Sequence, residues 1–165
     1  MKRFLIFVLS IILVFCLTAC SKAEINGETG ESEIISPEED AEMEGTAVNI
    51  MCGEYILEME LADTVAAKGF EAKLTSGNIS VQMRGYGDFE MVGGLGFSLA
   101  RNDVYVKAVT GDVMLYSGDQ IVIFYGSNSW SYTRIGRIKN ATREGLLDFF
   151  GTTGEVTIVF SKGTK

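Results

Sequence analysis

Residues 111–138 read GDVMLYSGDQIVIFYGSNSWSYTRIGRI, and they indicate the architecture of the chain more clearly than any other segment. Two apolar runs, residues 112–116 and 120–125, flank Ser117-Gly118-Asp119. This pattern is typical of a β-hairpin, because glycine accepts the backbone angles of a tight turn. Both runs are almost continuously apolar, so we expect each strand to be buried on both faces or to belong to a closed barrel.

Shorter alternating patterns extend the β structure along the rest of the chain. They predict strands at residues 48–52, 55–61, 79–83, 104–108, 130–135 and 156–160. Two helices are expected, one capped by Asp63 and the other capped by Thr142 and ended by Gly151. The glycine-dense segment 85–97 has no G-x-G-x-x-G sequence opening onto a helix, so it predicts a loop. The fold class that follows is mainly β, a closed eight-stranded β-barrel with two short capping helices.

Residues 1–20 have the features of a secretory signal peptide. Lys2-Arg3 precede the apolar run 4–17, and the segment ends in Leu17-Thr18-Ala19-Cys20. This ending resembles a bacterial lipobox, which implies that Cys20 is the lipidated first residue of the mature protein. The alternatives are a plain cleaved signal and a membrane anchor, although a spanning helix needs ~20 apolar residues and this run is shorter. The expected location is the extracytoplasmic face of the cell membrane, with membrane lipid as a partner through the acylated Cys20.

Charge and composition divide the rest of the chain into two parts. The formal net charge is -8, and the acids concentrate in residues 21–46, whose composition predicts a disordered acidic tether. Residues 47–165 are nearly neutral and carry no basic cluster, which excludes nucleic-acid binding, and their length predicts a single domain. Cys52 is the only cysteine left in that domain, so it has no disulfide partner within the chain and is expected to be buried in a strand.

The strand pattern carries a likeness to a known family. Residues 111–138, the helix start at 63–70 and the segment 86–95 resemble bacterial cyclophilin-like domains, and GSNSWSYTR at 126–134 is the most specific part. The resemblance covers most of residues 47–165 and implies an eight-stranded cyclophilin-type barrel with two helices. True cyclophilins isomerise X–Pro bonds with an essential arginine inside a Phe-His-Arg segment. This chain contains no histidine, so no catalytic residue is carried over from the family.

Few residues of the domain suggest chemistry. Without histidine, Ser/His/Asp catalysis is excluded, and no residues have the spacing of a metal site, so no catalytic residue, metal or cofactor is expected. Glu58, Glu60 and Glu90 are expected to be solvated acids. Aromatic residues offer a candidate binding site instead, because they combine a large contact area with a polar handle. The candidate ligand-binding residues are Phe89, Tyr125, Asn128, Trp130, Tyr132 and Arg134.

Two functional classes follow from these observations. The first is a membrane-anchored extracytoplasmic lipoprotein whose cyclophilin-like domain is a non-catalytic binding module for a peptide or small molecule. The alternative is an atypical peptidyl-prolyl cis-trans isomerase. A purely structural interpretation of the candidate residues is also open, in which Trp130 and Tyr132 plug one end of the barrel and Arg134 pairs with Asp112 or Glu90.

Overall fold

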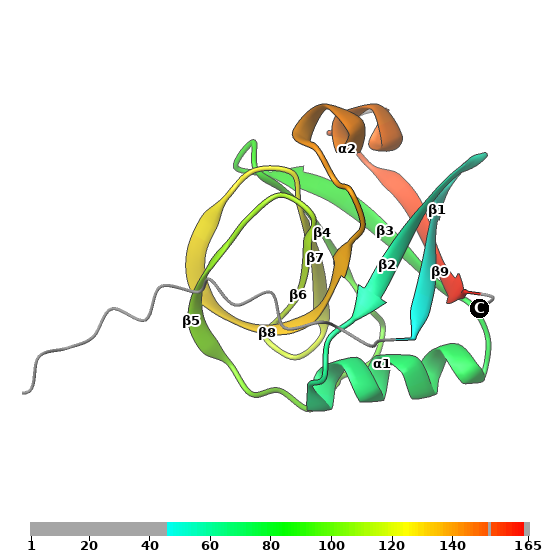
Figure 1. Ribbon diagram of the computed structural model, residues 1–165, viewed down its shortest axis with the longest axis vertical. Coiled ribbons are helices and arrows are strands. Elements are labelled where there is room, and N and C mark those ends of the chain that lie inside the picture. The colour runs from blue at the N-terminus through cyan, green and yellow to red at the C-terminus, as the bar shows by residue number, and fades with distance from the viewer. Residues whose placement is uncertain (1–45, 152, 164–165) are drawn as a thin grey trace, which may run out of the picture. The chain divides into compact units, whose positions relative to one another are not determined.

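The computed structural model describes residues 46–151 and 153–163 (Figure 1). In chain order the elements are β1 (Ala47–Cys52), β2 (Tyr55–Leu61), α1 (Val65–Thr75), β3 (Ile79–Tyr86), β4 (Glu90–Gly94), β5 (Val104–Ala108), β6 (Asp112–Tyr116), β7 (Gln120–Phe124), β8 (Asn128–Ile138), α2 (Arg143–Phe150) and β9 (Val156–Lys162). The expected signal peptide, Cys20 and residues 21–45 of the expected tether lie outside the described residues. Thr46, the last residue of that tether, donates a hydrogen bond from Oγ1 to Glu71 Oε1 at 2.7 Å.

Eight of the strands form a closed ring. Their order is β2-β1-β9-β3-β4-β7-β6-β8, and β8 pairs again with β2, where Met59 lies opposite Ile138. Closure satisfies both edges of every strand in the ring. The expected mainly β fold, with eight closed strands and two helices, is confirmed. The set of strands that forms the ring differs from the expected one, because residues 104–108 form β5, which pairs only with β8 and lies outside the ring.

The eighth strand of the ring comes from the glycine-dense segment, which was expected to be a loop. Gly87 and Asp88 make a turn with positive φ angles of 60° and 56°, and β4 begins two residues after Asp88. Gly93 is in β4 because the neighbouring strand approaches closely: a Cβ there would lie 2.5 Å from the carbonyl oxygen of Gln82 and 2.5 Å from Val81 Cγ1. The glycines of this segment therefore serve both a turn and a tightly packed strand.

The hairpin of β6 and β7 is buried on both faces, as its near-continuous apolar sequence predicted. Inside the ring, Val113 and Ile121 join the main core, which also contains Cys52 and the buried faces of both helices. On the outer face, Met114, Val122 and Phe124 form a second cluster with Ala108 and Tyr132. Cys52 is buried and forms no disulfide within the described residues, and burial raises the pKa of its thiol.

The two helices lie at opposite ends of the ring in the view of Figure 1. The first begins one residue later than expected: Thr64 is the N-cap, and its Oγ1 accepts a hydrogen bond from the backbone N–H of Ala67 at 3.0 Å. The same hydroxyl donates to the carbonyl oxygen of Arg134 at 2.7 Å, so it also ties the helix to β8. Asp63 was the expected cap, and it instead forms a surface ion pair with Lys68 at 2.6 Å.

The second helix has the predicted boundaries. Thr142 Oγ1 accepts from the backbone N–H of Gly145 at 3.0 Å, and Gly151 ends the helix in the left-handed region at φ 65°. Leu146, Phe149 and Phe150 are its buried residues, and they belong to the main core. Among the residues that the structure describes, neither helix is long and apolar enough to cross a membrane.

Candidate ligand-binding groove

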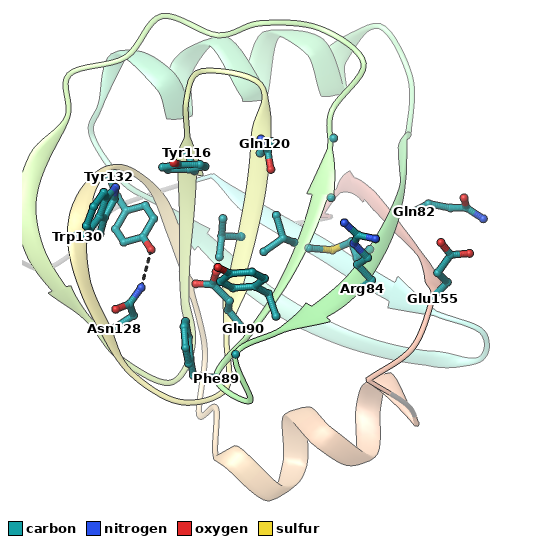
Figure 2. A pocket seen from close by; sticks show the side chains of 17 residues that line it. Gln82, Arg84, Phe89, Glu90, Tyr116, Gln120, Asn128, Trp130, Tyr132 and Glu155 are labelled. Carbon is teal, nitrogen blue, oxygen red and sulfur yellow. Dashed lines mark hydrogen bonds between the residues drawn. The ribbon is translucent and has the colours of Figure 1, made fainter.

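A groove of about 1050 Å³ opens on the outer face of the ring (Figure 2). Its lining residues come from β3, β4, β6, β7 and β8, from the turn between β3 and β4, and from Glu155 just before β9. Val92 and Val122 bring the outer apolar cluster into its floor. One wall exists because residues 128–132 of β8 pair with β5 rather than with a strand of the ring. That departure brings the ring of Tyr132 to 5.5 Å from the ring of Phe124, on the outer face of β7.

Aromatic side chains make up much of the lining. They are Tyr86, Phe89, Tyr116, Trp130 and Tyr132. Tyr132 is held firmly: it is 4% exposed, its ring meets the edge of Tyr116 at 6.1 Å, and its hydroxyl accepts a hydrogen bond from Asn128 Nδ2 at 3.2 Å. Trp130 is 55% exposed, so its ring is available to a ligand. The groove therefore combines a fixed tyrosine with accessible aromatic surface.

Four of the six candidate residues predicted from the sequence lie together in this groove. They are Phe89, Asn128, Trp130 and Tyr132. Phe89 contacts the ring of Tyr86 edge-on at 6.2 Å. Trp130 and Tyr132 line the groove on the outer face rather than one end of the ring.

Tyr125 lies on the other side of the wall. It directly follows Phe124, so strand alternation turns it into the main core, where it is 1% exposed. Its ring contacts that of Phe150 at 6.4 Å, and the guanidinium of Arg143 lies 5.2 Å from its centre. Burial raises the pKa of the Tyr125 hydroxyl. Tyr125 supports the second helix and does not line the groove.

Arg134 also lies outside the groove, in an ion-pair cluster with Asp112. Its Nη1 is 2.6 Å from Asp112 Oδ1, and Arg137 Nη1 reaches the same oxygen at 3.0 Å. Asp112 is 1% exposed, and its Oδ2 accepts from the backbone N–H of Val109 at 3.0 Å. A shift in the register of β6 and β8 next to Val113 accompanies this convergence of two arginines on one carboxylate. The structural interpretation, in which Arg134 pairs with Asp112, is the arrangement found.

Glu90 also lines the groove, although it was not among the ligand-binding residues predicted from the sequence. Glu58 and Glu60 are surface acids that share Lys139, at 2.7 Å and 2.8 Å, but the expectation of a solvated Glu90 is wrong: it is 6% exposed. Its neighbours across the sheet are Tyr86 and Phe124. Burial raises the pKa of Glu90 to about 7, and its Oε2 has no hydrogen-bond partner within the described residues. The period-2 pattern of Glu90, Val92 and Gly94 would have indicated a strand face if the glycines had not suggested a loop.

Arg84 is another groove residue that was not among the candidates predicted from the sequence. It precedes Tyr86 by two residues on the exposed face of β3. Figure 2 places it with Gln82 and Glu155 on the side of the groove opposite Trp130 and Tyr132. Glu90 lies between the two groups. The groove thus has an aromatic side, a charged side and a buried carboxyl group between them.

Comparisons with known proteins agree with this architecture. A solved structure of a hypothetical protein from Archaeoglobus fulgidus matches 72% of this chain and 95% of its own, with a TM-score of 0.54 and 20% identity, so the likeness is one of fold. No curated protein matches the chain. The model of the cyclophilin-like family matches residues 50–161, which span β2 to β8 and parts of the first and last strands. The chain therefore belongs to the cyclophilin-like family.

Proposed function

We propose that this protein is a membrane-anchored extracytoplasmic lipoprotein whose cyclophilin-like domain binds a peptide or small molecule in the outer-face groove, without catalysing a reaction. The observation that carries the proposal is the groove itself, which combines aromatic side chains with polar and charged ones. Ligand sites typically occupy roughly 300–1,000 Å³ and have this mixture of apolar and polar lining. The volume of about 1050 Å³ lies just above that range.

The anchoring part of the proposal depends on the sequence of residues 1–20. A basic start, an apolar run and the Leu17-Thr18-Ala19-Cys20 ending support lipidation at Cys20. A diacylglycerol on the thiol would supply more than one acyl chain, and stable anchoring requires more than one. The groove would then meet ligands outside the cytoplasm.

The chain contains a natural reporter for binding. Trp130 is its only tryptophan and lines the groove, so a ligand that enters should change the tryptophan emission. We would titrate the purified protein with a panel of short peptides and amines and follow that emission. Saturable changes are expected, and no saturable change with any compound would count against a binding role for this groove.

A blocking variant makes this test specific to the groove. Gly94 lines the groove, and a Cβ there meets no atom within 4 Å. Gly94→Leu should therefore place a bulky side chain in the groove without disturbing the fold and weaken binding about tenfold or more. The matched control is Glu54→Leu, which places the same side chain at an exposed position that does not line the groove. Equal affinity in the two variants would show that the ligand binds elsewhere.

One observation favours the isomerase alternative. Arg84 lies in the groove, and true cyclophilins depend on an arginine. The test is the rate of cis-trans isomerisation of a proline-containing peptide. Acceleration that Arg84→Ala abolishes, and that the exposed Arg101→Ala retains, would replace the binding proposal with a catalytic one. Isomerisation at the uncatalysed rate in all three proteins would rule out the isomerase alternative.

A further inference from the structure

The groove contains a buried acid without a counterion. Glu90 is 6% exposed, and its Oε2 has no hydrogen-bond partner within the described residues. Buried carboxylates are rare unless they are paired, because a buried acceptor without a donor costs free energy. The buried acid elsewhere in this domain follows the rule, since Asp112 receives two arginines and a backbone N–H. Glu90 is the exception, and it faces the groove.

The charged groups around Glu90 do not neutralise it. The charged side chains that line the groove are Arg84 and Glu155, its tyrosines Tyr86, Tyr116 and Tyr132 are neutral, and beyond Phe89 lie Asp88 and Arg143. Arg143 donates to the carbonyl oxygens of Asp88 and Tyr125. Burial is the cause that raises the pKa of Glu90, and no arginine or lysine lowers it. A positive charge brought by a ligand would therefore be the missing partner.

The aromatic lining suits the same kind of ligand. Trp130, Tyr132 and Tyr116 lie on one side of Glu90 (Figure 2), and Phe89 and Tyr86 contact each other beside it. Aromatic faces attract organic cations, and the attraction strengthens where water is excluded. A carboxylate among aromatic rings is thus a site for a positively charged nitrogen.

We propose that the groove takes a ligand bearing an alkylammonium group, and that Glu90 is the residue that accepts this group. This inference rests on the proposed binding function and names the chemical class of its ligand. The ammonium donates a hydrogen bond to the carboxylate of Glu90 from the groove while its carbon chain contacts the neighbouring rings. Arg84 and Glu155, on the charged side of the groove, remain available to polar parts of the ligand.

The test compares two tripeptides that differ only in charge. Acetyl-Ala-Lys-Ala-amide carries the ammonium, and acetyl-Ala-norleucine-Ala-amide has a similar side chain without it. Calorimetry with the purified protein at pH 8 should give an affinity about tenfold or more higher for the lysine peptide, as expected for a charged hydrogen bond in a partly buried site. Butylammonium chloride, the same cation without a peptide, tells whether a free amine suffices or a peptide is also needed.

Variants and pH identify the acid. Glu90→Gln should remove the preference for the lysine peptide, whereas Glu54→Gln, which removes the same charge from an exposed position outside the groove, should keep it. The preference should also fall as the pH drops below 7, because protonation of Glu90 removes the charge that the ammonium needs. A preference that survives Glu90→Gln, or that is the same at pH 5 and pH 8, would overturn the inference.

The outcomes separate this inference from the proposed function. Equal affinities for the two tripeptides would overturn the inference and leave groove binding intact. Absence of binding by both tripeptides and by butylammonium would also overturn the inference. Whether the groove binds other compounds is decided independently by the tryptophan titration and the Gly94→Leu variant.

Discussion

Replacing Glu90 with glutamine should change how the stability of the protein depends on pH. Burial raises the pKa of this carboxyl from its ordinary value of 4.5 to about 7, so the folded state holds the proton more tightly than the unfolded state. Stability contributed by this site is therefore greatest at low pH and is lost as the pH rises through about 7. Above that pH, the folded protein keeps an ionised carboxylate in an apolar setting.

The size of the effect follows from the shift. Each pKa unit corresponds to about 1.4 kcal/mol, so the full shift amounts to about 3 kcal/mol, of which about 2 to 3 kcal/mol falls between pH 5 and pH 8. Gln has nearly the same shape as Glu and does not ionise. The difference in unfolding free energy between Glu90→Gln and the wild type should therefore shift by that amount in favour of the variant across this interval.

Urea unfolding followed by tryptophan emission at a series of pH values measures this difference. Taking the difference in unfolding free energy between the two proteins cancels the contributions of the other acids, because these are the same in both. The control, Glu155→Gln, removes an exposed acid and should run parallel to the wild type. If Glu90→Gln also runs parallel to the wild type from pH 5 to pH 8, then Glu90 is not a buried acid with a raised pKa, and the reasoning fails.

Three further predictions concern the rest of the chain. Cys20→Ser should release the protein from membranes or leave the precursor uncleaved, and unchanged membrane partitioning and processing would refute lipidation. Residues 21–46 should be cut by protease while the domain stays intact, and deleting 25–44 should leave the thermal transition in place; loss of that transition would mean that the segment packs. Arg134→Ala should lower the unfolding free energy by about 1–2 kcal/mol, because Asp112 keeps only part of its pairing, and should leave ligand affinity unchanged. Weaker binding without loss of stability would mean that Arg134 belongs to the binding site.

The parts of the fold that could be predicted are those whose burial follows from the spacing of apolar residues that are close together in the sequence. The hairpin around Gly118 is apolar on both strand faces and interrupted by one turn, so neither its existence nor its burial was ambiguous. The strand at Glu90–Gly94 was hidden because composition does not distinguish a glycine needed for a turn from one needed for close packing. Gly93 is of the second kind, and only the neighbouring strand, which lies nearby in space, makes that requirement visible.

The same distinction applies to the groove. Alternation correctly grouped Trp130 with Tyr132, because both lie on one regular stretch of strand. Arg134 shares that spacing, but its side chain forms an ion pair with Asp112, which is distant in sequence, and so lies outside the groove. Tyr125 follows Phe124 directly, so alternation alone could have placed it on the inner face. Glu90 could not be recognised as buried without first recognising its strand.

A map of backbone amide shifts on ligand addition would show whether the outer-face groove is the functional site. Isotope-labelled protein would be titrated with the compound that gives the strongest response in the tryptophan titration. Shifts are predicted at Glu90, Val92, Val122 and the indole of Trp130, and Gly94→Leu should reduce them at the same ligand concentration. Shifts confined to β1, β2 and the first helix, or shifts of equal size in the wild type and Gly94→Leu, would show that the ligand binds elsewhere.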